Sequence, residues 1–344
     1  MINKAYWENK KVLVTGHTGF KGSWLSAVLR HFGSEVIGLS DGSILSDEYK
    51  TQDRKYIYKE EFTLDISDDM SDLRPVLSKH EIDTVFHLAA QGIVSTAFQY
   101  PLKTIMSNII GTYNILDLVN SYENINSLVI STTDKVYLET SKENTEEDKL
   151  GGQEFYSASK ASTEHIINAY LKTKKRNSLN VGVIRSGNVL GGGDGAKDRI
   201  MTDVINALKK SNEITLRMPE SIRPWQYILD SLTGYLLTCE YVTTQSVDEV
   251  FNLNSLSNNK YTVRNLTDEI VEAWKPDTDF KIKIEKSDLQ ETETLIINSN
   301  KANKLLNWSP KYEIKDIAEK IVSWEKSAFK GKNITSDQIT DFYS

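Results

Sequence analysis

The chain has a single cysteine, Cys239, among its 344 residues. An internal disulfide is therefore excluded, and such sparse cysteine use is typical of a protein in the reducing cytoplasm. No apolar run approaches the ~18 residues of a membrane span, and the first ten residues lack the apolar region of a signal peptide. Acidic residues outnumber basic ones, and the formal net charge at pH 7 is -7. We expect a cytoplasmic, soluble protein without a metal site and with neither nucleic acid nor membrane as a partner.

Internal repeats and low-complexity segments are also lacking, and short apolar runs alternate with longer helical patterns. This alternation predicts βαβ units and an α/β fold, a Rossmann-type doubly wound parallel sheet with a smaller, mostly C-terminal α/β substrate domain. The division expected is 1–185 plus 222–254 for the first domain, and 186–221 plus 255–344 for the second. We predict strands at 11–15, 35–39, 61–64, 84–88, 127–132, 180–185, 225–228 and 250–254, and helices at 24–32, 104–122 and 157–174.

A glycine-rich turn, Gly16-x-x-Gly19-x-x-Gly22, joins the first predicted strand to the first predicted helix. Glycines in this context permit a tight turn and bring the backbone close to a pyrophosphate at the positive end of a helix. The strand before and the amphipathic helix after the motif make a purely structural turn the weaker reading. The loop therefore predicts a dinucleotide site, with Thr18 and Phe20 between the glycines as further contacts.

Other candidate cofactor residues follow the later strands. Asp41, after the second strand, can bind ribose hydroxyls and repel a 2′-phosphate, which favours NAD over NADP. A turn or capping role for Asp41 is equally open. Asp65 and Ile66 end the third strand, where a carboxylate can meet the adenine edge or cap a turn. The small residues of Ala89-Ala90-Gln91 after the fourth strand leave room for a cofactor across the carboxyl end of the sheet.

The sequence contains three Tyr-x-x-x-Lys pairs, Tyr6/Lys10, Tyr156/Lys160 and Tyr170/Lys174, each on one face of a helix if helical. Only Tyr156/Lys160 opens a helix after a glycine-bearing loop and follows the end of the fifth strand. We expect the ammonium of Lys160 to lower the pKa of the Tyr156 phenol, so that the phenol accepts a proton from a sugar hydroxyl. Lys160 can also hold the nicotinamide ribose.

Thr133, Asp134 and Lys135 come directly after the fifth strand, at the edge where open parallel sheets bind ligands. The Thr133 hydroxyl can share the hydrogen-bond network of the substrate with Tyr156. Asp134 is a candidate acid if burial raises its pKa. Lys135 is a candidate base or an electrostatic stabiliser. A polar loop start without chemistry is the alternative for this pair.

Taken together, these residues resemble the extended short-chain dehydrogenase/reductase superfamily over nearly the whole chain, with Asn108 as a further match. Within it the chain resembles the CDP-glucose 4,6-dehydratases. Residues 15–22, 133–137, 187–194 with 198–199, and 222–226 carry the narrower match. The Asp134-Lys135 pair favours the CDP-glucose 4,6-dehydratases over other sugar-nucleotide 4,6-dehydratases, because the others tend to have a carboxylate at the position of Lys135.

The resemblance implies that Tyr156 takes the proton of the glucose 4-hydroxyl while hydride passes from C4 to NAD. Lys135, or a group near it, then removes the C5 proton as Asp134 protonates the departing 6-hydroxyl, and hydride returns to C6. The product is a 4-keto-6-deoxy sugar. The resemblance also assigns Asn108 to the cofactor and places Asn188, Arg199, Arg217 and Arg223 on the nucleotide-diphosphate side.

A homodimer through a four-helix interface, built from helices 104–122 and 157–174, is implied as well. Segments 92–96 and 138–148 depart from the family pattern beside the sugar pocket, so the sugar and the nucleotide stay open. An NAD-dependent epimerase or decarboxylase is the first alternative, but it needs no acid at Asp134. A non-catalytic NAD-binding protein is the second.

Overall fold

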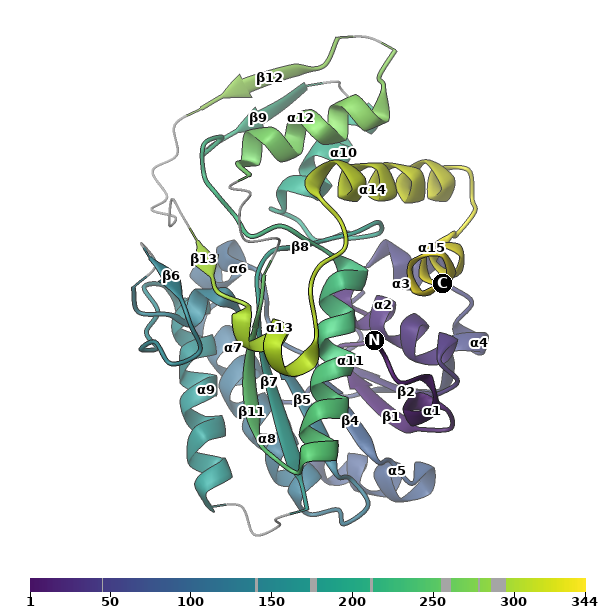
Figure 1. Cartoon of the computed structure of the whole chain (residues 1–344), viewed down its shortest axis with the longest axis vertical. Helices are drawn as coiled ribbons and strands as arrows, with labels where there is room; N and C mark the ends of the chain where they lie inside the picture. The colour runs from purple at the N-terminus through teal and green to yellow at the C-terminus, as the bar shows by residue number, and fades with distance from the viewer. Residues whose placement is uncertain are drawn as a thin grey trace.

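A parallel sheet of seven strands forms the centre of the protein in the computed structural model (Figure 1), which describes residues 1–44, 46–139, 142–173, 178–210, 213–254, 261–277, 279–285 and 295–344. The strand order is β11-β7-β5-β4-β1-β2-β3, and every neighbouring pair is parallel. The strand order reverses at β1 and β4, which defines the switch point of a doubly wound sheet. The strands are β1 (Lys11–Thr15), β2 (Glu35–Ser40), β3 (Tyr58–Thr63), β4 (Thr84–His87), β5 (Ser127–Ser131), β7 (Asn180–Ser186) and β11 (Glu249–Leu253).

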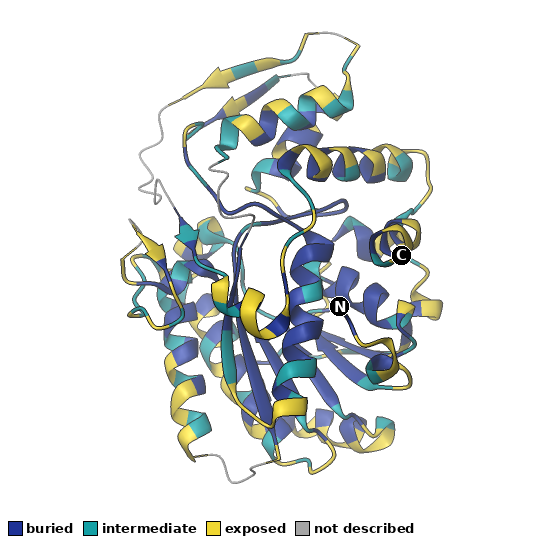
Figure 2. Ribbon diagram, in the orientation of Figure 1, coloured by how far each residue is buried: buried dark blue, intermediate teal, exposed yellow. Residues whose placement is uncertain are grey.

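Helices cover both faces of this sheet, which is why its central strands are continuous apolar runs. In β1, Val12 and Val14 belong to the core under one helical layer and Leu13 to the core under the other. Figure 2 shows the strands in the middle of the sheet as mostly buried, with exposed residues on the outer sides of the helices. One layer contains α2 (Phe20–His31) and α11 (Ile228–Gln245), and the other contains α5 (Leu73–His80), α8 (Gly111–Asn120) and α9 (Phe155–Thr173).

A second group of elements lies beyond the carboxyl ends of the strands, at the top of Figure 1. Helix α12 packs against both α10 and α14, and β12 pairs with β9 in a parallel two-stranded ladder. Two other C-terminal helices return to the main sheet, because α13 contacts α11 and α15 contacts α2. The elements are α10 (Ile200–Lys210), β9 (Glu213–Leu216), α12 (Val263–Trp274), β12 (Lys281–Ile284), α13 (Asn300–Leu306), α14 (Ile314–Phe329) and α15 (Thr335–Tyr343).

Short elements complete the chain. Strand β8 pairs with β10, and β6 pairs with β13, each as a parallel two-residue ladder. Within the described part of the chain no helix is long and apolar enough to cross a membrane. The short elements are α1 (Lys4–Trp7), α3 (Asp47–Thr51), α4 (Arg54–Ile57), η1 (Met70–Asp72), α6 (Val94–Gln99), α7 (Pro101–Ile105), η2 (Met106–Ile110), η3 (Asp134–Val136), β6 (Glu143–Asn144), β8 (Val189–Leu190), β10 (Gln226–Tyr227) and β13 (Ile296–Ile297).

The fold class predicted from the sequence is confirmed, and one local prediction needs correction. Residues 225–228 do not return to the main sheet, because only Gln226 and Tyr227 are extended and they pair with β8. The helix predicted over 104–122 is present as an unbroken helical run from Pro101 to Asn120, in which α7, η2 and α8 follow one another directly. The middle piece is a π-helical turn in which the Gly111 amide donates to the Met106 carbonyl five residues back.

The other boundaries shift by small amounts. Helix α2 begins at Phe20, so Gly22 lies inside the helix rather than before it. Strand β3 begins at Tyr58, three positions before the predicted start, because polar Lys59 and Glu60 hide this edge of the sheet in the sequence pattern. Helix α9 runs to Thr173, and the predicted final residue, Lys174, lies outside the described residues.

Candidate active site

The glycine loop joins β1 to α2 at the centre of the sheet edge. Gly16 has a φ of +73°, and a Cβ placed there would lie 2.7 Å from the amide nitrogen of Ala89. A Cβ at Gly22 would lie 2.2 Å from the Gly16 carbonyl oxygen. Only glycine therefore fits at these two positions. Gly19 is the N-cap residue of α2, and no side chain caps the amides of the first turn. These amides, which form the positive end of the helix dipole, therefore stay open to a ligand at this edge.

The residues between and after the glycines hold the loop in place. The Thr18 hydroxyl donates to the Ser43 carbonyl at 2.6 Å, which ties the loop to the turn after β2. Phe20 is the first residue of α2 and is buried. A backbone cradle with these contacts fits a pyrophosphate at a helix N-terminus.

The two acidic residues predicted at the cofactor site make turn contacts. Oδ1 of Asp41 accepts the Ser43 amide at 2.9 Å. Oδ1 of Asp65 accepts both the amide and the hydroxyl of Ser67, at 2.9 and 2.8 Å. Such turn contacts are the alternative to a cofactor role that the sequence left open for both Asp41 and Asp65. Ile66 is buried against α8, where a Cβ at Gly111 would lie 2.6 Å from its Cδ1.

The segment after β4 is linked to helix α9 through Asn108. Asn108 is buried in the π-helical turn; its Oδ1 accepts the Gln91 amide at 2.8 Å and its Nδ2 donates to the Gln91 carbonyl at 3.0 Å. Nδ2 also donates to the Ser159 hydroxyl at 2.8 Å. Ser159 lies directly before Lys160, so Asn108 fixes α9 relative to Ala89, Ala90 and Gln91. The π-helical turn allows this buried side chain to reach both partners.

The five predicted catalytic residues come together at the carboxyl end of β5. Thr133, Asp134 and Lys135 form the short helix η3 and the residue before it, and Tyr156 and Lys160 lie one turn apart on α9. The hydroxyl of Thr133 donates to Oδ1 of Asp134 at 2.9 Å, and Thr133 also makes a side-chain hydrogen bond with Tyr156. The Lys135 ammonium lies 6.0 Å from the centre of the Tyr156 ring.

Burial changes the acidity of this cluster. Desolvation raises the pKa of Asp134, against the opposing charges of Lys135 and Arg223. Oδ2 of this carboxyl is buried and has no hydrogen-bond partner among the residues that the structure describes. Desolvation also lowers the pKa of Lys160 to about 8. A carboxyl with a raised pKa can hold a proton for donation at neutral pH.

The expectation for Tyr156 was wrong in direction. Desolvation raises the pKa of its phenol to about 12, and the hydrogen bond with Thr133 only partly opposes the change. The Lys160 ammonium, which we expected to lower this pKa, donates instead to the Ser131 carbonyl at 3.1 Å. Burial is therefore the main influence on the phenol pKa.

Lys21 was not predicted as a site residue, although it lies within the glycine loop. Its ammonium is 3.5 Å from the Tyr235 hydroxyl, and burial followed by the charge of Arg199 lowers its pKa to about 8. The charge of Lys21 also acts on Asp134 and on Lys160. A lysine within the apolar start of α2 was the signal in the sequence.

The residues predicted for the diphosphate divide into two sets. Arg199 lies 3.3 Å from Oδ2 of Asp194, and its charge acts on Tyr156. Arg223 is buried, and its charge acts on Asp134. These two guanidinium groups therefore belong to the catalytic neighbourhood.

The other two diphosphate candidates are Arg217 and Asn188. Arg217 is exposed just after β9, and its charge acts on Asp203 of α10. Asn188 precedes β8, and its carbonyl accepts the Gln226 amide at 2.9 Å. Their predicted roles stay predictions.

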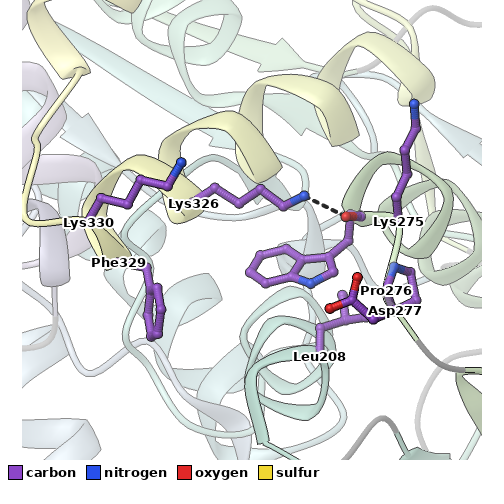
Figure 3. A pocket seen from close by; sticks show the side chains of 8 residues that line it. Leu208, Lys275, Pro276, Asp277, Lys326, Phe329 and Lys330 are labelled. Atoms are coloured by element: carbon purple, nitrogen blue, oxygen red, sulfur yellow. Dashed lines mark hydrogen bonds between the residues drawn. The ribbon is translucent and has the colours of Figure 1, made fainter.

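A separate surface hollow of about 510 Å³ lies between α10, α12 and α14 (Figure 3). Lys326 donates to the Trp274 carbonyl there at 2.5 Å and so caps the C-terminal end of α12. None of the predicted site residues line this hollow. Across the described residues no group of three His, Cys, Asp or Glu side chains could hold a metal ion.

The fold and this cluster define a class of protein that acts on nucleotide sugars. Residues 13–321 match the family model described as GDP-mannose 4,6 dehydratase, and the chain belongs to this family. It is 32% identical to CDP-glucose 4,6-dehydratase of Salmonella typhimurium, over 100% of this chain and 99% of that protein. It is 27% identical to dTDP-glucose 4,6-dehydratase 1 of Escherichia coli, over 93% of this chain and 94% of the relative.

Solved structures show the same fold. UDP-glucose 4-epimerase of Thermotoga maritima, solved with UDP-glucose, superposes with a TM-score of 0.79 at 23% identity, covering 92% of this chain and 99% of that one. dTDP-glucose 4,6-dehydratase of Bacillus anthracis, in complex with NAD, superposes with a TM-score of 0.77 at 24% identity, covering 94% and 98%. The identity is low enough that these structures establish the fold alone.

Proposed function

We propose that the protein is an NAD-dependent nucleotide-sugar 4,6-dehydratase that converts CDP-glucose to CDP-4-keto-6-deoxyglucose. The observation that carries this proposal is the buried carboxyl of Asp134, whose raised pKa suits an acid. The Thr133 hydroxyl is hydrogen-bonded both to this carboxyl and to Tyr156, and so connects the two groups. Membership of the dehydratase family and the full-length likeness to a CDP-glucose 4,6-dehydratase support it.

The cofactor site fits a dinucleotide on the evidence of its backbone. A Cβ at Gly16 or Gly22 would collide with neighbouring backbone, so the loop runs as closely packed bare backbone, and the N-terminus of α2 opens beside it. We assign the pyrophosphate to this loop, the adenosine side to Asp41, Asp65 and Ile66, and the nicotinamide side to Ala89, Ala90, Gln91 and Asn108. Bound NAD would accept the hydride that leaves C4 of the sugar and would return it later in the cycle.

The oxidation step relies on Tyr156, Lys160 and Thr133. Tyr156 accepts the proton of the 4-hydroxyl as the C4 hydride leaves, and Thr133 holds the same oxygen by a hydrogen bond. A phenol with a pKa of about 12 needs added positive charge to act as a base. The positive charge of a nicotinamide held beside Tyr156 and Lys160 would supply it.

The elimination step relies on Asp134 and Lys135. The 4-ketone makes the C5 hydrogen acidic, and Lys135 removes that proton. Asp134 donates its proton to the departing 6-hydroxyl, which leaves as water. Hydride return to C6 and protonation at C5 complete the product without net redox change.

The nucleotide diphosphate is assigned to arginine. Guanidinium groups grip pyrophosphate in a bidentate manner, and Arg199 and Arg223 are the two that act on the catalytic cluster. Asn188 and Arg217 are proposed as outer contacts. We also keep the domain division made from the sequence as a proposal.

A homodimer is part of the proposal. Apolar side chains spaced by three or four residues along α7, η2 and α8 face outward, the pattern of a helical interface. They are Leu102 (71% exposed), Ile105 (36%), Met106 (38%), Ile110 (37%) and Tyr113 (46%). Leu102→Glu should shift the mass in light scattering from dimer to monomer, whereas Phe329→Glu on α14, exposed by 80%, should leave the dimer intact.

We also propose that the protein acts in the cytoplasm.

The substrate test compares nucleotide sugars. Purified protein is incubated in parallel with CDP-, UDP-, GDP- and dTDP-glucose, and product mass is read without added reductant. Loss of one water from CDP-glucose alone is the expected result. An unchanged mass with a 4-epimer detected by NMR would support the epimerase alternative, and water loss from another nucleotide sugar would correct the substrate.

A further inference from the structure

A buried ion pair lies beneath the active site. Glu164 on α9 and Arg185 on β7 are 2% and 3% exposed. Nε of Arg185 lies 3.0 Å from both carboxylate oxygens of Glu164, and Nη2 lies 2.6 Å from Oε2. This bidentate geometry fixes both side chains. Because a buried ion pair adds little net stability over an apolar pair of the same shape, its place in the site needs a different explanation.

The pair holds the catalytic turn, residues 133–135, at both of its ends. Before the turn, the Thr132 hydroxyl donates to Oε1 of Glu164 at 2.7 Å. After the turn, Nη1 of Arg185 donates to the Tyr137 hydroxyl at 2.9 Å. Both of these partners are buried. The one ion pair therefore sets where the turn begins and where it ends.

The same pair is built into the helix that carries the other catalytic residues. Tyr156, Lys160 and Glu164 are spaced by four residues and share one face of α9. Lys160 donates to the Ser131 carbonyl, the residue before Thr132. The end of β5 and this face of α9 are thus joined at two successive turns of the helix.

We propose that Thr132, Glu164 and Arg185 are positioning residues that fix the catalytic turn 133–135 relative to Tyr156. The inference rests on the proposed function, in which oxidation at C4 and elimination at C5 and C6 act on one bound sugar. The group that oxidises and the groups that eliminate must then keep their spacing through the cycle. Misplacement by about 1 Å can cost a factor of about 100 in rate.

The test uses a matched set of threonine variants. Thr132→Val removes the hydroxyl and keeps the shape, while Thr132→Ser restores the hydroxyl. We expect Thr132→Val to lower kcat for water loss by about ten- to a hundredfold with KM for CDP-glucose nearly unchanged, since a positioning contact acts in the transition state. Thr132→Ser should recover most of kcat. Tyr137→Phe, which loosens the other end of the turn, should lower kcat in the same way.

The control is Thr335→Val. Thr335 is also buried and also donates to a buried glutamate, Glu48, at 2.5 Å, but on the C-terminal helix. Thr335→Val should lower the melting temperature as Thr132→Val does, but its kcat should equal that of the unchanged protein. Equal kcat values for Thr132→Val, Tyr137→Phe and Thr335→Val would overturn the inference.

Hydrogen–deuterium exchange of the amides of residues 133–137 separates this inference from the proposed function, because it needs no substrate. Thr132→Val should exchange faster there than the unchanged protein and Thr335→Val, even if no nucleotide sugar is turned over. Unchanged exchange would overturn the positioning role. Absence of turnover by the unchanged protein would overturn only the function.

Discussion

The hydroxyl of Thr133 donates to Oδ1 of Asp134 at 2.9 Å, which leaves Oδ2 as the atom that can hold a proton. Oδ2 is buried and unpartnered among the described residues, and burial raises the pKa of the carboxyl. A threonine that fixes one oxygen and a burial that favours a proton on the other are what the acid role proposed for Asp134 requires.

Replacement of this acid separates the two halves of the reaction. Asp134→Asn keeps Oδ1 as an acceptor for Thr133 but cannot donate a carboxyl proton. We expect water loss to fall by about 10²- to 10⁴-fold, the usual weight of a general acid. Oxidation at C4 should persist, so the absorbance of enzyme-bound NADH should appear on mixing with substrate. Water loss at an unchanged rate would remove Asp134 from the chemistry.

Two tyrosines on α9, Tyr156 and Tyr170, make an internal comparison. Tyr156→Phe should remove both NADH formation and water loss, by about 10²- to 10⁴-fold. Tyr170, whose hydroxyl donates to the Leu116 carbonyl at 3.1 Å, is the matched control. Tyr170→Phe should keep kcat. Similar losses in both variants would mean that the effect of Tyr156→Phe is structural.

Gly16 and Gly331 have nearly the same backbone, with φ of +73° and +74°. A Cβ at Gly331 meets no atom within 4 Å, whereas a Cβ at Gly16 would collide with the backbone of residues 88 and 89. Both alanine variants should lose about 1–2 kcal/mol of stability from left-handed strain. Only Gly16→Ala should also lose NAD affinity in calorimetry, by at least about tenfold. Equal NAD affinity in both variants would place the cofactor away from this loop.

Asp230 predicts how stability depends on pH. Its carboxyl is 1% exposed, and burial raises its pKa to about 7 although it accepts the amide of Lys311 at 2.7 Å. The folded protein therefore keeps a proton that the unfolded chain releases above its pKa of about 4. The stability from this group is complete below pH about 4 and is lost as pH rises through about 7.

Asp230→Asn cannot ionise and should lack this loss. Its melting temperature should rise relative to the unchanged protein as the pH goes from about 4 to about 7, and the difference should level off above about pH 7. Scanning calorimetry across that range measures the difference. Melting curves that shift in parallel at every pH would contradict the raised pKa.

Some of the molecule could be predicted from the sequence because local patterns determine it. The apolar run of β1, the glycines that follow and the pairing of Tyr156 with Lys160 depend on neighbours in the chain. The edge strand β3 was less visible, since polar Lys59 and Glu60 interrupt its pattern. The π-helical turn at Asn108 depends on Gln91 and Ser159, which lie far away in the sequence.

The electrostatics of the site were the least predictable part. The pKa of Tyr156 depends on how far tertiary packing excludes water, and this burial reversed the expected direction. Lys21 joins the cluster only because α2 carries it to the end of β5, near Tyr235. Spacing in the sequence gives the identity of reacting groups, but burial decides their protonation.

The central claim is that one bound sugar is oxidised, dehydrated and reduced in a single cycle. The most direct measurement uses CDP-glucose carrying deuterium at C4, with the product analysed by mass spectrometry and NMR. The account predicts loss of one water with the deuterium transferred to the C6 methyl group and a solvent hydrogen at C5. Deuterium retained at C4 in an epimerised sugar, or lost to solvent without dehydration, would contradict it.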